Sequence, residues 1–349
     1  MPVESFNIHG VSVRLVGLDE GPAAALVPQL DRWLGWAAAD APAAEADFRI
    51  ELSPTAVIAD ARLAAMRRRE PFFHHAHSDL PQFYGRYQVT GFRDGDFVLL
   101  DFGRFGHVCF DYAERSVRAH LPGEAIAGPG AGLHTAMMFF LEMPVYWALA
   151  SRGLFALHAA GVRVHGTTWL LSAGTRSGKT TTVVALVQAG GEFLGDDWVL
   201  LRRDGGGVVA HSFPCWIGLR RPSLRWFADL AALGEPAVDG TDKLNLDPRL
   251  AWPGRLLDAA APDALLRPTI VGGPVSESRP LSRLDALHRL MEDNLSLTHP
   301  AMAEAFFEIL VDLAEQAPAH ELRLGDDPLA VAEALAKIRP GDDGRGAPR

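Results

Sequence analysis

The chain has 349 residues, of which 48% are apolar, 33 are Lys or Arg and 43 are Asp or Glu, so that the formal net charge is −10. The apolar content is sufficient for a hydrophobic core and excludes a disordered chain. The length suggests about two domains. The acidic balance argues against a broad surface for nucleic acid or an anionic membrane, and we expect neither as a partner.

The cysteines, the N-terminal segment and the longest apolar run together indicate where in the cell the protein is expected. Cys109 and Cys215 are far apart and have no Cys or His neighbours at zinc spacing, which predicts two buried free thiols in a reducing compartment. The N-terminal segment lacks the basic stretch and apolar core of a secretory signal. The longest apolar run, residues 137–150, is interrupted by Glu142 and Pro144 and predicts a core helix rather than a membrane span. We therefore expect a cytoplasmic protein.

The N-terminal part alternates between strand-like and helix-like patterns. Apolar and polar residues alternate at 11–15 and 48–52, which predicts two strands, and residues 23–36 between them have a helical composition. Residues 84–121 predict an antiparallel meander with a hairpin turn at Asp94-Gly95.

Residues 53–82 predict irregular structure. The basic triplet Arg67-Arg68-Arg69 is interpreted as a solvated face. The run His74-His75-Ala76-His77 is interpreted as a polar loop, because no cysteine or paired carboxylate lies at ligand spacing. Residues 1–130 are thus expected to form a small α+β domain that recognises a substrate or partner.

The remaining chain divides into three expected parts. Gly, Pro and Ala dominate residues 122–132 and predict a linker, and an apolar helix with a break at Pro144 is expected to join two domains over residues 131–152. Residues 153–338 are expected to form the second domain, and residues 339–349 a disordered tail. Helices in the second domain are predicted at 180–189, 281–291, 300–315 and 329–338.

The strongest motif is Ala173-Gly174-Thr175-Arg176-Ser177-Gly178-Lys179-Thr180, which follows a short apolar strand and opens a helix. This is the context of a phosphate-binding P-loop, in which backbone N–H groups and a helix N-terminus surround a polyphosphate. Lys179 would reach the β- and γ-phosphates, and the Thr180 hydroxyl would bind Mg²⁺. The residues expected to hold the nucleotide are Gly174, Thr175, Arg176, Ser177, Gly178, Lys179, Thr180 and Thr181.

One position departs from the usual pattern, because Ala173 occupies the place of the first glycine. If that position requires a positive φ, alanine destabilises it by about 1 kcal/mol or somewhat more. Gly174 could shift the turn by one residue. The alternative interpretation of the motif is an ordinary glycine-rich turn.

Two further features accompany the loop. Asp196 and Asp197 follow an apolar stretch after the loop helix, where a carboxylate could hold Mg²⁺ and another could accept a hydroxyl proton. The alternative is a helix cap or turn. His158 lies among apolar residues before the loop and, taken alone, is typical of a core histidine.

Together, His158, the 173–180 loop and the Asp196-Asp197 pair resemble the catalytic domain of HPr kinase/phosphorylase and its relatives. The resemblance implies an α/β P-loop domain of the type shared with phosphoenolpyruvate carboxykinases, preceded here by the smaller α+β domain. It implies an ATP- and Mg²⁺-dependent transfer to a Ser hydroxyl, with Asp196, His158 and Lys179 as catalytic residues. Asp196 would be the proton acceptor, His158 would lie close to it and tune it, and Asp197 would help to hold Mg²⁺. Relatives can form rings, which leaves a homo-oligomer open.

The resemblance is specific over residues 154–201 only. The family's later Glu-Ile-Arg-Gly-Leu-Gly run is missing, and residues 211–220 occupy that region, which puts HPr and phosphorylase activity in doubt. The chain is more similar to HPr-kinase-like proteins found beside peptide-modification genes, including lasso-peptide kinases. We therefore expect a peptide or protein substrate with a Ser hydroxyl.

Alternatives remain open. They are a kinase of a free amino acid or sugar, an ATPase or nucleotide switch without a phospho-acceptor, and a binding module that has lost its chemistry. Lys243 could face the transferring phosphate or be a surface lysine. Arg220 and Arg221 could bind phosphate or substrate or be solvated, and Arg176 is expected to point outward.

Overall fold

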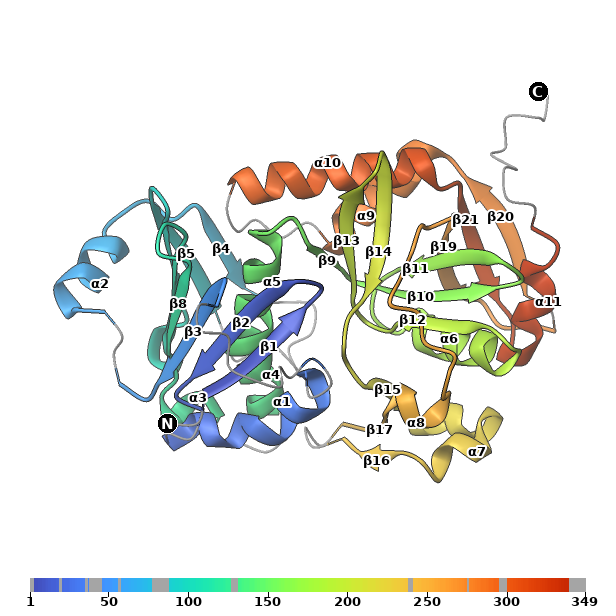
Figure 1. Ribbon diagram of the computed structural model, residues 1–349, viewed down its shortest axis with the longest axis horizontal. Coiled ribbons are helices and arrows are strands. Elements are labelled where there is room, and N and C mark those ends of the chain that lie inside the picture. Colours follow the sequence, from blue (N-terminus) through green and yellow to red (C-terminus); the bar gives the residue numbers. More distant parts are fainter. Residues whose placement is uncertain are drawn as a thin grey trace. The chain divides into compact units, whose positions relative to one another are not determined.

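The computed structural model describes residues 3–18, 21–34, 37, 46–55, 58–76, 88–126, 131–237, 241–274, 276–294 and 300–338. The chain divides into two compact units, Met1–Arg152 with Val238–Thr241, and Gly153–Ala237 with Asp242–Arg349. Each unit combines helices with β-sheet, so the expected mixed α/β class is confirmed (Figure 1). No helix among the described residues is long and apolar enough to cross a membrane.

The first unit is built on an eight-stranded sheet in the order β1-β2-β3-β8-β7-β6-β5-β4. β2 and β3 are parallel, as are β3 and β8, and the other neighbours are antiparallel. The strands predicted near residues 11–15 and 48–52 and the meander after residue 88 are confirmed. The strands are β1 (Val3–Ile8), β2 (Val11–Val16), β3 (Phe48–Ser53), β4 (Phe73–Ala76), β5 (Gln88–Asp94), β6 (Phe97–Asp101), β7 (His107–Asp111) and β8 (Ser116–His120).

The helices of this unit are η1 (Gly21–Leu26), α1 (Val27–Leu34), α2 (Asp60–Arg67), η3 (Gly103–Phe105), α3 (Gly123–Ile126), α4 (Ala131–Met137), the π-helical η4 (Met138–Glu142) and α5 (Met143–Ala150). The sequence did not predict α2, η3 and α3 as helical. The prediction of irregular structure over residues 53–82 is wrong, because α2 and β4 lie there. Buried Leu63 and Met66 of α2 join a core cluster with Phe92 and Leu99.

The expected linker and linking helix also differ from the structure. α3 lies inside the segment predicted as a linker, where Ala125 is buried. The helices of residues 131–150 belong to the first unit, because α5 packs against β2 and β3. Pro144 lies in the first turn of α5, directly after the π-helical η4. Proline has no N–H to donate, and the change from π-helix to α-helix occurs where this donor is missing.

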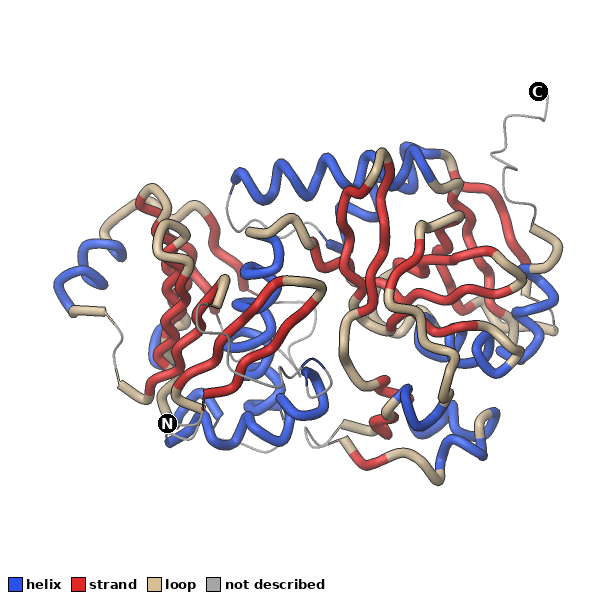
Figure 2. The backbone as a smooth tube through the Cα atoms, in the orientation of Figure 1, coloured by secondary structure: helices blue, strands red, loops and turns tan. Residues whose placement is uncertain are grey.

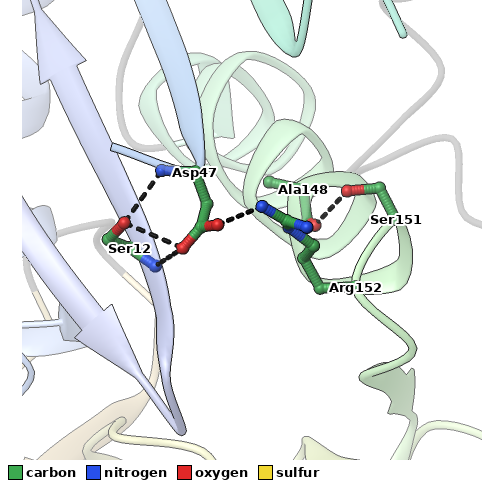
Figure 3. Close-up of polar contacts among 5 residues, drawn as sticks. All are labelled: Ser12, Asp47, Ala148, Ser151 and Arg152. Carbon is green, nitrogen blue, oxygen red and sulfur yellow. Dashed lines mark hydrogen bonds and ion pairs between the residues drawn. The ribbon is translucent and has the colours of Figure 1, made fainter. Parts of the chain in front are cut away.

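A polar cluster ties the end of the first unit to its sheet (Figure 3). The backbone N–H and hydroxyl of Ser12 donate to Asp47 Oδ2 at 3.0 and 2.9 Å, and the Asp47 N–H donates to Ser12 Oγ at 2.8 Å. Arg152 forms an ion pair with the other oxygen of Asp47. The backbone hydrogen bond from Ser12 and the charge of Arg152 hold the pKa of Asp47 below its ordinary value.

The second unit contains three sheets, in the orders β12-β10-β11-β19-β21-β20, β18-β14-β13-β9 and β15-β17-β16. The strands are β9 (Phe155–Leu157), β10 (Ala159–Val164), β11 (Thr167–Ser172), β12 (Glu192–Gly195), β13 (Val199–Asp204), β14 (Gly207–Ser212), β15 (Ile217–Arg220), β16 (Glu235–Pro236), β17 (Lys243–Leu246), β18 (Ala259–Ala260), β19 (Ala264–Ile270), β20 (Glu277–Leu281) and β21 (Ala319–Leu324).

The helices of the second unit cover these sheets. They are α6 (Lys179–Gln188), η5 (Arg221–Trp226), α7 (Ala228–Ala231), α8 (Pro248–Ala251), α9 (Arg283–Asn294), α10 (Pro300–Gln316), η6 (Pro328–Ala330) and α11 (Val331–Leu335). α6 packs on β10, while α10 crosses the β13–β14 hairpin and packs against it (Figure 2). The four predicted helices are confirmed, and α6 begins one residue earlier than expected. The predicted tail, residues 339–349, lies outside the described residues.

Candidate phosphate-binding and phosphoryl-transfer site

Four strands of the six-stranded sheet end at one edge. β11 is parallel to β19, and β19 is parallel to β21. β12 is antiparallel to β10, which is antiparallel to β11, so β12 also runs in the direction of β11. The carboxyl ends of parallel strands are the usual place for ligands in open α/β sheets. The glycine-rich loop follows β11, and the Asp196-Asp197 pair follows β12, so both features belong to this edge.

His158 and the acidic pair are brought together because two chain segments leave one sheet for another at the same point. β9 and β13 pair in the four-stranded sheet, with Leu157 opposite Val199. Their continuations β10 and β12 pair in the six-stranded sheet. His158 is the residue between β9 and β10, and residues 196–198 lie between β12 and β13. The two crossings are therefore neighbours, and the rings of His158 and Trp198 are 5.4 Å apart.

The glycine-rich loop folds back around its own lysine. Lys179 is only 5% exposed, and its Nζ donates to the carbonyl oxygens of Ala173 at 2.5 Å and Gly174 at 3.3 Å. The left-handed positions of the loop are Arg176, with φ of 65°, and Gly178, with φ of 99°. Ala173 is buried and lies outside the left-handed region, so this position does not require glycine. The backbone strain that a positive φ would have caused at Ala173 is therefore absent.

The loop ends at Gly178, which is the N-cap residue of α6. This glycine offers no side-chain hydrogen bond to the first turn of the ten-residue helix. The buried Ser177 hydroxyl has no hydrogen-bond partner among the described residues. Unsatisfied donors and the helix dipole favour an anion at such an end. Thr175 and Arg176 are exposed, in agreement with the outward orientation expected for Arg176.

Asp196 is buried beside the first turn of α6. It is 1% exposed, and its Oδ1 accepts a hydrogen bond of 3.0 Å from the Thr180 hydroxyl. Its Oδ2 is buried without a hydrogen-bond partner in the part of the chain that the structure describes. Burial, followed by the charge of Asp197, raises the pKa of Asp196 to about 7, against the lowering effects of Thr180, Lys243 and Lys179. A carboxyl group with this pKa can exchange a proton near neutral pH.

The acidic pair occupies a tight turn. Asp197 is half-buried with φ of 60°, and the Trp198 N–H donates to the Asp196 carbonyl at 2.7 Å across it. The same carbonyl accepts a 3.5 Å hydrogen bond from the thiol of Cys215, which is buried as predicted. Left-handed Asp costs free energy, and such positions occur often at functional sites.

His158 is held through its backbone. Its N–H donates to Asn294 Oδ1 at 2.5 Å, and its carbonyl accepts from the Ser172 hydroxyl at 3.4 Å. The Asn294 amide in turn donates to Ser172 Oγ and to the Leu290 carbonyl. Asn294 ends α9, far along the chain from the loop, and no local sequence signal pointed to it.

The basic candidates lie on the three-stranded sheet and at the start of η5, which follows β15. Lys243 of β17 is directly opposite Arg220 of β15, and its charge acts on Asp196. Arg221 forms an ion pair with Asp242 at 3.6 Å. The hydroxyls of Thr181 and Ser223 are 3.2 Å apart, which connects η5 to the first turn of α6. Of these cations, Lys243 has the closest tie to the acidic pair.

The residues present suit a nucleotide and Mg²⁺. The loop and the N-terminus of α6 provide donors for phosphates, and Thr180 and Asp197 provide the oxygen ligands that Mg²⁺ prefers. One carboxylate and one hydroxyl agree with the usual magnesium site, in which phosphates and water complete the ligands. Among the described residues, no group of three or more His, Cys, Asp or Glu side chains could hold a metal ion by itself. The side chains of the His74–His77 run lie outside the described residues.

Comparisons with known proteins give little further guidance. No protein-family model matches the sequence, and no curated protein is significantly similar to it. Among solved structures, the chain is similar to the Hpr(Ser) kinase/phosphatase from Coxiella burnetii, with 11% sequence identity and a TM-score of 0.32. The match covers 52% of this chain and 88% of that chain.

Proposed function

We propose that the protein is an ATP- and Mg²⁺-dependent kinase that transfers the γ-phosphoryl group to a Ser-type hydroxyl of a peptide or protein. The observation that carries the proposal is the Thr180–Asp196 hydrogen bond of 3.0 Å, which joins the first turn of the glycine-rich loop's helix to a buried carboxyl group. Phosphoryl transfer to a hydroxyl needs a phosphate site and, beside it, a group that accepts the proton of the attacking hydroxyl. This arrangement supplies both.

In the proposed reaction, the acceptor oxygen forms a bond to the γ-phosphorus while the bond to the β–γ bridging oxygen breaks. The hydroxyl proton passes to the Asp196 carboxylate, and the electron pair of the broken bond leaves with ADP. Lys179 and the N-terminus of α6 neutralise charge on the phosphates. Thr180 and Asp197 would hold Mg²⁺, which when bound supplies further charge neutralisation. Most of the catalysis is positioning and electrostatic stabilisation.

His158 has a positioning role in this proposal. Its backbone is fixed by Asn294 and Ser172, and its ring packs against Trp198. That packing supports the turn that holds Asp196. The resemblance described in the sequence analysis likewise implies that His158 lies close to Asp196.

Binding tests the first part of the proposal. We expect calorimetry to detect Mg²⁺-ATP binding to the wild-type chain, and we expect Lys179→Ala to lose most of it because the variant lacks a cation that is buried in the loop. Asp196→Asn should retain binding. If the folded wild-type chain does not bind ATP, the kinase proposal fails.

Transfer tests the second part. Arrayed Ser-containing peptides with matched Ser→Ala copies, free amino acids and sugars serve as acceptors, and ADP release is measured in parallel. We expect phosphate on the Ser copies only, and a loss of at least about 100-fold for Asp196→Asn, the range of general-base catalysis. Transfer retained by this variant would refute the proton-acceptor role. Transfer to free amino acids or sugars instead would identify a small-molecule kinase, and hydrolysis unaffected by any acceptor would indicate an ATPase.

A further inference from the structure

An apolar patch lies beside the glycine-rich loop on the side away from the acidic pair. Ile270 ends β19 with its side chain 61% exposed, and Val271 follows it with 44% exposed. Single exposed apolar residues are common on protein surfaces and require no explanation. The position of these two is informative, because β19 is the direct neighbour of β11, which carries the loop.

The patch is in contact range of the loop. A Cβ placed on Gly178 would lie 3.5 Å from Ile270 Cγ1 and 2.6 Å from Leu324 Cδ1. Gly178 is the N-cap of α6, where the N–H groups of the proposed phosphate site begin. An apolar group attached to a bound phosphate chain would therefore reach Ile270 at the rim of the same site, and Val271 is the next residue of the chain.

The backbone around the patch is fixed by hydrogen bonds. The N–H groups of Val271 and Gly272 both donate to the Leu324 carbonyl, at 3.1 and 3.2 Å. Gly273 donates to Asp326 Oδ2 at 3.2 Å, and the Asp326 N–H donates back to the Gly273 carbonyl at 2.8 Å. The exits of β19 and β21 are thus joined to each other, which presents the two apolar side chains on a preorganised surface.

Strand order decides which end of a nucleotide lies here. In the order β12-β10-β11-β19-β21, the acidic pair follows β12 on one side of β11, and Ile270 ends β19 on the other. In-line transfer places the acceptor oxygen and the leaving β–γ bridging oxygen on opposite sides of the γ-phosphorus. With the acceptor beside Asp196, the phosphate chain leads away from Asp196 across the loop. The nucleoside end then lies on the β19 side.

We propose that Ile270 and Val271 form the seat for the nucleotide base, an inference that rests on the proposed function. A base presents a flat apolar face, and two exposed aliphatic side chains on a fixed backbone offer the complementary surface. Aliphatic contact recognises the face of a base and not the polar groups on its edge. Mg²⁺-ATP and Mg²⁺-GTP should therefore bind with affinities within about threefold of each other, and the choice between them is not made at this seat.

The test compares a nucleotide with a phosphate chain that has no base. Calorimetry with Mg²⁺-ATP and with Mg²⁺-tripolyphosphate is performed on the wild-type chain, on the double variant Ile270→Ser/Val271→Thr, and on the control Leu284→Ser, whose side chain is 76% exposed on α9. Loss of the apolar contact should weaken ATP binding about five- to tenfold. Tripolyphosphate affinity should not change, and the control should behave as wild type.

Each outcome is informative. Unchanged ATP affinity in the double variant overturns the base seat and leaves the kinase proposal intact, and an equal loss of ATP and tripolyphosphate affinity also overturns it, since the loop itself would then be affected. If the folded wild type binds neither ligand, both proposals fail. Photolabelling of the wild type with an azido-adenine nucleotide gives an independent measurement, and a label mapped away from residues 264–274 would refute the seat.

Discussion

The substitution Asp196→Asn should stabilise the second unit at alkaline pH while it removes transfer activity. Asparagine keeps the size of the side chain and a carbonyl oxygen that can accept the Thr180 hydrogen bond. It removes a charge that burial and Asp197 make unfavourable. The carboxylate charge that the proposed reaction requires thus lowers the stability of the folded state.

The magnitude follows from the pKa. The pKa of Asp196 rises from 3.8 to about 7 on folding, so between these values the native state binds a proton that the unfolded state has lost. Stability therefore falls as pH increases through this window. The full penalty, about 3 pKa units at about 1.4 kcal/mol each, is about 4 kcal/mol and is complete above about pH 7. At about pH 5 it is only about 2 kcal/mol.

Urea unfolding of the full chain at about pH 5 and about pH 8 measures this difference. The gain in stability from Asp196→Asn should be about 2 kcal/mol larger at the higher pH than at the lower pH. This corresponds to a change of roughly 1 M in the urea midpoint. Asp204→Asn, at an exposed hairpin end, is the matched control and should follow the wild type at both. A variant that is no more stable than wild type at the higher pH, or a gain that does not widen, would refute the reasoning.

Two further pairs of substitutions test the contacts described above. In denaturant unfolding, Gly178→Ala should lower the stability of the protein by about 1–2 kcal/mol more than Gly190→Ala does. Both glycines have a φ near +100°, but only at position 178 would the added Cβ meet a side chain, at 2.6 Å. Equal losses would show that backbone strain alone matters. In the first unit, Ser12→Ala should lower stability by about 1–2 kcal/mol because it removes two hydrogen bonds to Asp47, whereas Arg152→Ala, which breaks a partly exposed ion pair, should cost under about 1 kcal/mol. The reverse order of these two losses in urea unfolding would contradict the assignment.

Local patterns were sufficient for elements whose own residues carry the signal. Alternation over 11–15 and 48–52 predicted β2 and β3, and the glycine-rich loop predicted the start of α6 to within one residue. The failures have a common cause. α2 has only two large apolar residues, Leu63 and Met66, and they become buried only because Phe92 and Leu99 arrive from distant strands. No window of sequence around residue 60 contains those partners.

The same division holds at the candidate site. The sequence by itself determined the chemical groups: a loop with Lys179 and Thr180, an acidic pair, and His158 before the loop. Only the tertiary structure decided that Asp196 is buried against Thr180 and has its pKa raised, because desolvation depends on every element packed around it. It also decided that Asn294 holds His158 and that Ile270 borders the loop, since helix packing and strand pairing bring together residues that are far apart in the chain.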